Sequence, residues 1–122
     1  TCVQLSGITC KDGQSCTVAP EYATKLNGLV SASGESLLVT EAYPPTRTHQ
    51  AACHTNGTCT DVVFADRNFT TARILQFQAS AAANGMHAVY EPGPGGSCSG
   101  ISNCLPNSTT KATGDHFSLY MR

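Results

Sequence analysis

The chain has 122 residues, enough for one domain with a single modest hydrophobic core. Charged residues make up only 12% of it and the formal net charge is −1, so the basic surface of a nucleic-acid-binding protein is not expected. No run of residues approaches the roughly eighteen apolar positions of a membrane-spanning helix. The composition therefore indicates a small globular domain with no nucleic-acid partner and no transmembrane segment.

Residues 1–19 are rich in Cys and Gly and show no periodicity, so they are predicted to be an irregular, disulfide-linked N-terminal segment or the end of a linker. The folded domain is expected to span 20–122. Its first element is a helix that begins at Pro20, a residue favoured in the first helical turn, and ends before Gly34. A strand is predicted over 36–43, where β-prone residues precede two prolines.

The middle of the chain contains the clearest secondary-structure signals. Residues 60–64 form an apolar, β-prone run after an Asn-Gly pair at 56–57, which predicts a turn that leads into a buried strand. Residues 70–84 are helix formers closed by an Asn-Gly stop. Residues 86–90 then follow as another strand.

The C-terminal part combines a long loop with a final strand. Residues 91–115 are rich in Gly, Pro, Ser, Asn and Thr, and a loop of this length is usually functional or disordered. Residues 115–121 alternate in polarity, as a half-buried strand should. This order of elements predicts an α+β fold: a small, mainly antiparallel sheet with two helices packed on it and disulfide-stabilised loops.

Seven cysteines in so short a chain indicate an oxidising compartment, which is extracellular, at the cell surface or periplasmic. Their spacings do not match the paired Cys-x-x-Cys of zinc knuckles. Cys53 and Cys59 enclose a short loop, as do Cys98 and Cys104, and each pair is predicted to form a local disulfide. We expect three local disulfides and one remaining cysteine, with the connectivity open. The other cysteines are Cys2, Cys10 and Cys16.

One segment contains the residue types of a metal site. His54 lies before the predicted Asn-Gly turn, and Asp61 lies at the start of the strand over 60–64. The turn would bring the two side chains toward one ion, and an imidazole nitrogen with a carboxylate oxygen is a usual partial ligand set for zinc. One more protein ligand is needed. His49 and His87 are expected to be surface or supporting residues rather than ligands.

The same segment resembles a known signature. The pattern Gln-x-x-x-His-x-x-Gly-x-x-x-Asp at 50–61, followed by Val-Val, is similar to the zinc motif of the D-alanyl-D-alanine carboxypeptidase family. Many phage endolysins share that family, and the hedgehog signalling domain is related to it in fold. The resemblance runs from Pro20 to the C-terminus. It implies that His54, Asp61 and His116 bind zinc and leave a fourth position for water.

The resemblance also implies catalytic groups, which this chain carries only in altered form. The family's general base is a Glu a few residues before the last zinc-binding His, and no Glu lies there. The substitutes are Glu91, at the end of the preceding strand, and Asp115, whose side chain is expected on the opposite face from His116. Pro44 replaces the family's substrate-binding Arg, and the nearest guanidinium is that of Arg47.

These features predict an extracytoplasmic zinc-binding domain similar to the metallopeptidases that hydrolyse peptide bonds in peptidoglycan. Because the usual Glu and Arg are missing, catalysis is expected to be weakened or lost. The alternative is a non-catalytic structural or binding module of a cell-surface or filament protein, and the sequence leaves this choice open. The expected partner is a cell-wall peptide or another extracellular ligand, with a larger surface assembly in the second case.

Overall fold

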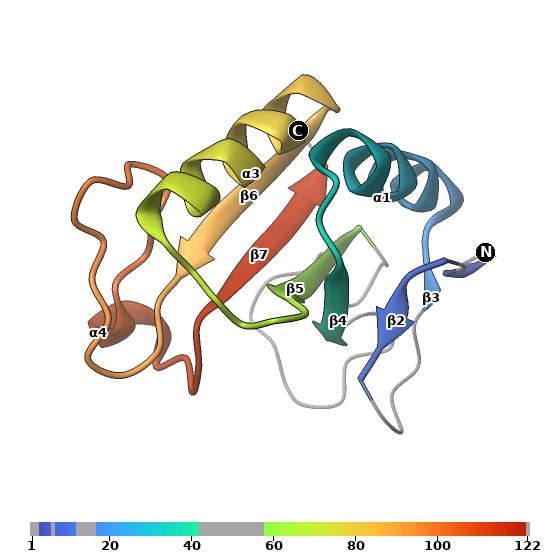
Figure 1. The fold of residues 1–122 in the computed structure, drawn as a ribbon. Coiled ribbons are helices and arrows are strands. Elements are labelled where there is room, and N and C mark those ends of the chain that lie inside the picture. Colours follow the sequence, from blue (N-terminus) through green and yellow to red (C-terminus); the bar gives the residue numbers. More distant parts are fainter. Residues whose placement is uncertain (1–2, 6, 12–16, 42–57, 122) are drawn as a thin grey trace.

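The computed structural model describes residues 3–5, 7–11, 17–41 and 58–121. These residues form a five-stranded sheet, a separate two-stranded sheet, and two main helices packed on the same side of the larger sheet (Figure 1). The predicted α+β class with a mainly antiparallel sheet is confirmed. The elements are β1 Val3–Gln4, β2 Thr9–Cys10, β3 Thr17–Val18, α1 Pro20–Ser33, β4 Leu37–Glu41, β5 Cys59–Phe64, α3 Thr71–Ala83, β6 Met86–Glu91, α4 Asn107–Thr110 and β7 His116–Met121.

The strand order of the larger sheet is β2-β4-β5-β7-β6, with every neighbouring pair antiparallel except β2 and β4. The register sets Glu91 opposite His116 and Asp61 opposite Ser118. Side chains that lie directly opposite one another share a face of the sheet, and every second residue along a strand returns to that face. The side chains of Asp61, Glu91 and His116 therefore lie on the same face.

Helix α1 is fixed to the opposite face by a buried tyrosine. The Tyr22 hydroxyl donates to the Leu119 carbonyl oxygen at 2.6 Å and lies 2.8 Å from the Thr60 hydroxyl oxygen. Burial raises the pKa of Tyr22 well above its ordinary value, so the hydroxyl stays neutral in this setting. The helix ends as predicted, because Gly34 adopts a left-handed conformation and its N–H bonds to the Val30 carbonyl.

The core between the helices and the sheet is aromatic. Phe117 is fully buried on β7, and its ring centroid lies 4.7 Å from that of Phe77, 5.4 Å from Phe64, 5.7 Å from Phe69 and 5.8 Å from Tyr90. The alternation predicted for the last strand thus places its apolar side chains under the helices. His116, the residue before Phe117, points to the other face.

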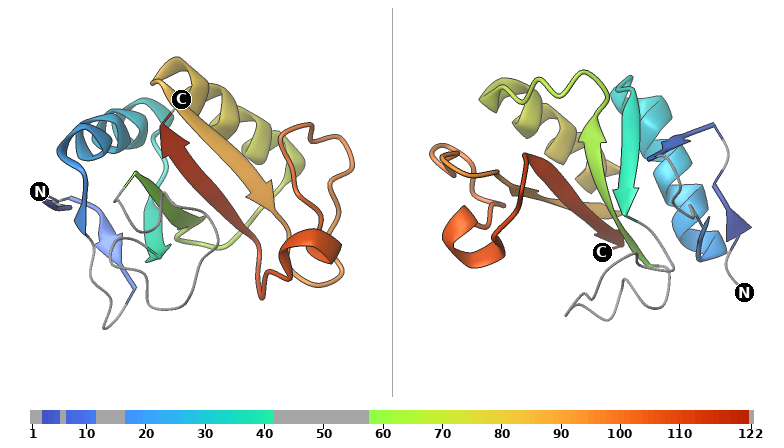
Figure 2. Two further views of the ribbon diagram at one scale, coloured as in Figure 1. Left: turned by 180° about the vertical axis from the view of Figure 1, so that it is seen from behind. Right: turned by 90° about the horizontal axis from the view of Figure 1, so that it is seen from below.

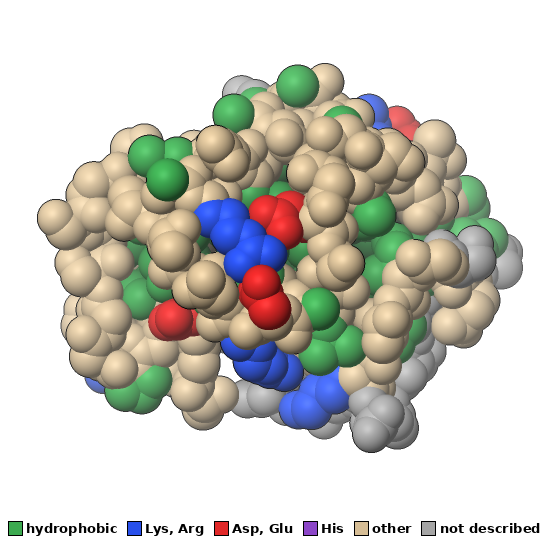
Figure 3. All heavy atoms as spheres, in the orientation of Figure 1, with side chains coloured by type: hydrophobic (Ala, Val, Ile, Leu, Met, Phe, Trp, Pro, Cys, Tyr) green, Lys and Arg blue, Asp and Glu red, His purple; other side chains and the backbone are tan. Residues whose placement is uncertain are grey.

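An ion-pair cluster joins three separate elements on one surface; we call Glu35, Asp66 and Arg73 the Arg73 cluster. The Arg73 guanidinium binds both oxygens of Glu35, at 2.7 and 2.9 Å, and both oxygens of Asp66, at 2.8 and 3.0 Å. It also donates to the Asn68 carbonyl at 2.8 Å and lies over the Phe64 ring at 4.1 Å. Figure 3 shows basic and acidic side chains alternating in one band across this face.

The described residues of the N-terminal segment include three short strands, which its lack of periodicity did not predict. Its β2 joins the larger sheet beside β4, and β1 pairs with β3. Leu5 and Val18 are both buried in the core. Strands of two residues are too short to show an alternating pattern, so this pairing could not be predicted from hydrophobic periodicity.

The segment between β6 and β7 projects beyond the end of the sheet and carries α4 (Figure 2). Its predicted disulfide, Cys98–Cys104, is confirmed. A parallel bridge joins Cys104 to Tyr90, and the Tyr90 N–H donates to the Asn103 carbonyl at 2.9 Å. The predicted loop is thus a covalently closed segment fastened to the edge strand β6.

Two further cysteines of the described residues, Cys10 and Cys59, are also disulfide-bonded. The predicted pairing of Cys59 with Cys53 falls on a residue outside the described part of the chain. Disulfides of this kind are compatible with an extracellular location. In the described residues, no helix combines the length and the apolar character needed to cross a membrane.

Candidate functional site

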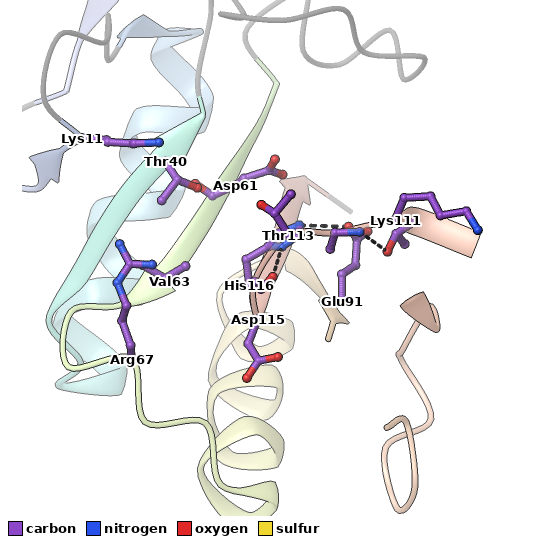
Figure 4. Close-up of a pocket in the computed structure, with 13 residues that line it drawn as sticks. Lys11, Thr40, Asp61, Val63, Arg67, Glu91, Lys111, Thr113, Asp115 and His116 are labelled. Atoms are coloured by element: carbon purple, nitrogen blue, oxygen red, sulfur yellow. Dashed lines mark hydrogen bonds and ion pairs between the residues drawn. The ribbon is translucent and has the colours of Figure 1, made fainter. Parts of the chain in front are cut away.

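An open pocket of about 350 Å³ lies on the sheet face that carries Asp61, Glu91 and His116 (Figure 4). Strands β4, β5, β6 and β7 supply its floor, and the segment before β7 supplies one wall. Turns after β2 and β5 supply the other wall. The lining residues are Lys11, Thr40, Asp61, Val63, Arg67, Glu91, Thr110, Lys111, Ala112, Thr113, Gly114, Asp115 and His116.

His116 and Glu91 form an ion pair in this pocket. The His116 Nε2 lies 2.9 Å from Glu91 Oε1, and both side chains are less than a fifth exposed, at 17% and 16%. The pairing follows from the β6–β7 register, which sets the two residues opposite one another. On the other side of the ring, Nδ1 lies 3.1 Å from the Gly114 carbonyl oxygen. Both ring nitrogens therefore face oxygen acceptors, which favours the doubly protonated imidazolium.

The surroundings of His116 act on its pKa in opposite directions. Burial lowers the pKa, while the hydrogen bond with Glu91, the charge of Asp61 and the Gly114 carbonyl raise it. The net effect is a raised pKa, because the acceptors and carboxylates stabilise the cation more than burial destabilises it. Asp61 lines the same pocket.

The structure describes two of the three predicted zinc ligands. Asp61 and His116 line the same pocket, while His54 lies outside the described residues. Among the residues that the structure describes, no group of three or more His, Cys, Asp or Glu side chains is arranged to hold a metal ion. The convergence of His54, Asp61 and His116 therefore stays a prediction.

The two substitutes for the family's general base occupy different positions. Glu91 reaches His116, as described above. The Asp115 carboxylate accepts a hydrogen bond from the Gly93 N–H at 2.8 Å and points away from His116 in Figure 4. Desolvation and the adjacent Asp115 carboxylate raise the pKa of Tyr90 to about 12. Asp115 thus fastens the loop to β6 on the side away from the Glu91–His116 pair.

The wall before β7 is held by an asparagine side chain. The Asn107 amide nitrogen donates to the Ala112 carbonyl at 2.8 Å and to the Pro92 carbonyl at 3.1 Å. These bonds tie the two ends of the segment together and fix the backbone that leads to Gly114 and His116. The sequence contained no signal for this role, because Asn107 lies in a run of ordinary loop residues.

Three cations that the sequence did not single out also line the pocket: Lys11, Arg67 and Lys111. Arg67 and Lys111 have positive φ angles, 56° and 58°, and are the two non-glycine residues of the described chain with this conformation. Such a backbone conformation is unfavourable for residues with a Cβ and clusters at binding sites. Each cation lies on a turn or at a strand end, where hydrophobic periodicity carries no information.

The other predicted residues lie elsewhere. His87 stacks on the Tyr120 ring, with centroids 4.9 Å apart, and is not among the residues that line the pocket. Arg47, the nearest guanidinium in sequence to the family's Arg position, lies outside the described residues, as does His49.

No protein-family model matches this chain, and no curated protein matches it in sequence. The similarity to the D-alanyl-D-alanine carboxypeptidase family stays a prediction from the motif at 50–61, most of which lies outside the described residues.

Proposed function

We propose that this protein is an extracytoplasmic zinc-binding domain of the D-alanyl-D-alanine carboxypeptidase type, whose ligand is a cell-wall peptide. One observation supports this proposal above the others: Asp61, Glu91 and His116 line the same open pocket. Two of these are predicted zinc ligands and the third is the predicted base. They come from three strands, β5, β6 and β7, so the fold itself gathers them.

The pocket contains an imidazole nitrogen and a carboxylate oxygen, which are usual zinc ligands, and a hydrogen bond at the other ring nitrogen orients the imidazole. The His116 Nδ1 is directed at the Gly114 carbonyl, which leaves Nε2 facing the pocket. Zinc-binding histidines commonly hold their other ring nitrogen in this way. In the present arrangement Nε2 is paired with Glu91, so metal binding at this atom requires the ring to lose a proton and the carboxylate to move. Asp61 and His54 would supply the remaining ligands.

Zinc bound at this site would polarise a substrate carbonyl and lower the pKa of a water molecule. Glu91, which lines the same pocket, would act as the general base and acid that takes a proton from water and returns it to the leaving amine. Asp115 does not serve this role in the described arrangement, because its carboxylate bonds to Gly93 and points away. The enzymatic version of the proposal therefore depends on Glu91 alone.

A second candidate is a non-catalytic binding module, and the Glu91–His116 pair favours it. The two groups satisfy one another at 2.9 Å, so the pocket has a stable charged floor without any ion. Such a domain would keep the fold and use the pocket or the disulfide-closed loop for contacts within a surface assembly.

Zinc titration of purified protein by calorimetry tests the proposal. We expect the wild type to bind one zinc ion, and Asp61→Asn or His116→Ala to weaken binding by at least about tenfold, since each removes a ligand. His87→Ala is the matched control, because His87 lies on β6, the strand that carries Glu91, but outside the pocket, and it should bind as the wild type does. A wild type that binds no zinc contradicts the proposal.

Muropeptide digestion then separates the two candidates. Turnover by the zinc-loaded wild type that is lost in Glu91→Gln supports the peptidase. Zinc binding without turnover identifies the binding module.

A further inference from the structure

We propose that Lys11 and Arg67 form a subsite for a carboxylate group on the wall of the pocket opposite Glu91 and His116. The ligand is then a small molecule or chain end that carries one negative charge and, a few bonds away, an N–H donor. This inference goes beyond the zinc proposal and does not depend on it, because the two cations that form the subsite are not predicted metal ligands.

The first observation is that these two cations have no side-chain partner among the residues that the structure describes. The side chains of Lys11 and Arg67 form no hydrogen bond or ion pair with any described residue. Arg73, in contrast, is saturated by two carboxylates and a carbonyl. A protein surface usually leaves lone cations solvated and scattered. Here both border one concave site, where low dielectric walls strengthen their attraction for an anion.

Figure 4 shows how the two cations lie. Lys11 and Arg67 are on the same side of the pocket, Lys11 beside Thr40 and Arg67 beside Val63, while His116 and Glu91 lie across from them. Lys111 points away from this group in the same view, so we leave it out of the subsite. A guanidinium and an ammonium on one wall can together bind a single carboxylate.

The second observation concerns the backbone of Arg67. Its φ of 56° is unfavourable for an arginine, and a glycine or asparagine would adopt it more readily. The Arg67 N–H donates to the Phe64 carbonyl at 2.8 Å, which closes the turn. The Arg73 cluster holds both neighbours, through the Asp66 carboxylate and the Asn68 carbonyl. The turn is thus clamped on each side while the Arg67 side chain remains available to the pocket.

Lys11 is fixed by different means. Its N–H donates to the Val39 carbonyl at 2.9 Å, which continues the β2–β4 pairing by one residue. The side chain therefore starts at a defined point on the sheet edge. Two cations from segments far apart in the sequence are each held by backbone bonds at the same wall.

The charges across the pocket define the rest of the ligand. Asp61 and Glu91 place two carboxylates in the pocket beside one imidazolium, so a second negative charge is less favoured there than a neutral amide. An ionised carboxylate has several acceptor positions, so it can accept an amide N–H in addition to the partners it already has. A monoanion with an amide therefore fits better than a dianion such as phosphate. A pocket of about 350 Å³ holds a fragment of this size.

Three matched probes test this charge pattern: succinamate has one carboxylate and one amide, succinamide has two amides, and succinate has two carboxylates. Binding is followed by ¹H–¹⁵N NMR titration of the wild type in the presence of a chelator, so that zinc plays no part. We expect succinamate to bind, and each of the other two to bind at least about fivefold more weakly. Binding should also weaken in about 0.5 M NaCl, because partly exposed charges are screened.

Variants locate the subsite. Lys11→Gln and Arg67→Gln should each weaken succinamate binding about three- to tenfold, the range for exposed charge-assisted contacts. Lys25→Gln is the control, since Lys25 lies on α1 outside the pocket and should bind normally. Arg67→Lys should retain part of the affinity.

Several results would overturn the subsite. These are no succinamate binding at about 20 mM, far above the millimolar affinity of a weak specific ligand, equal binding of succinamide, or an equal loss in Lys25→Gln. A zinc titration that fails leaves these measurements unaffected, so the two proposals fail separately. Succinamate linked to a peptide then distinguishes a free metabolite from a chain end.

Discussion

Two charged groups on this domain use the same residue types and differ in how completely their charges are paired. In the Arg73 cluster, one guanidinium satisfies two carboxylates and a carbonyl. In the pocket, Lys11 and Arg67 have no described partner, although carboxylates lie across from them. Charged residues alone therefore do not mark a binding site. The pocket differs in having two cations whose backbones are fixed by hydrogen bonds and whose side chains have no partner among the described residues.

The two groups are also coupled. The Arg73 cluster joins the segment before β4, the turn after β5 and the first turn of α3. That turn carries Arg67, so the paired cluster fixes the backbone from which the unpaired cation projects. In this turn, Asp66 and Asn68 contribute to stability through their contacts with Arg73, and Arg67 between them contributes to the proposed subsite.

The largest expected effect comes from breaking the paired cluster. Arg73→Met should lower the free energy of unfolding by about 1–2 kcal/mol, because it leaves the Glu35 carboxylate without its bidentate partner and removes the contact over Phe64. We place the value in the lower part of the range for charged hydrogen bonds, since Asp66 is 58% exposed and its pair is screened by solvent. Urea unfolding followed by circular dichroism measures it.

Arg67→Met is the matched control for this prediction. It removes an arginine side chain six residues away in the sequence, but one that forms no ion pair with a described residue. Its stability should stay within about 0.5 kcal/mol of the wild type. Equal losses in both variants would remove the distinction between the two groups.

The sequence predicts features that depend on residues close together in the chain, and it does not predict those that depend on contacts between distant segments. The bounds of α1 follow from local chemistry, Pro20 at its start and Gly34 at its end. The alternation in β7 follows from burial of one face. Lys11 and Arg67 meet at the pocket only because β2, β4 and β5 are neighbours in the sheet. Surface cations show no periodicity, so nothing in the sequence separates these two from solvated ones.

The pocket's own pair provides a pH-dependent test. Glu91→Gln removes the carboxylate that faces His116, and in the presence of a chelator we expect a loss of about 1 kcal/mol at mildly acidic pH. The pKa of His116 is raised in the folded protein. The pair's contribution is therefore fully present below the unfolded value near 6.5 and is lost as pH rises through the folded value.

Unfolding curves of wild type and Glu91→Gln at about pH 5.5 and about pH 8, on either side of the ordinary histidine pKa, measure this window. Their difference should shrink at the higher pH. A difference that grows with pH would mean that His116 is neutral in the folded protein and that Glu91 stabilises it in another way.

The Arg73 cluster should show the opposite dependence. The hydrogen bonds from Arg73 and from the Asn68 N–H lower the pKa of Asp66. A lowered pKa contributes stability above the unfolded value near 3.9, and this is lost as pH falls through the folded value. Acid unfolding should thus separate wild type from Asp66→Asn at about pH 5, where the carboxylate is ionised, and the two should converge at lower pH. Parallel curves throughout would show that the Asp66 pair contributes nothing.

The smallest change in stability should come from relieving the backbone of Arg67. In Arg67→Gly the left-handed φ of 56° no longer opposes a Cβ, while the unfolded chain gains flexibility. The two effects nearly cancel, so we expect a free energy of unfolding equal to the wild-type value or up to about 1 kcal/mol higher. Succinamate binding should fall as it does in Arg67→Gln, because the guanidinium is absent.

Arg67→Ala separates the two causes. It also lacks the guanidinium, so it should bind succinamate as weakly as Arg67→Gly does. It keeps the Cβ, however, and should be less stable than the glycine variant by about 1 kcal/mol. Equal stability of the two variants would show that the turn relaxes away from its left-handed conformation once the arginine is gone. The pairing of an unfavourable backbone with a free cation would then be incidental. If Arg67→Ala is less stable than Arg67→Gly and both bind succinamate equally weakly, the left-handed backbone disfavours an arginine here and the position retains it for its charge.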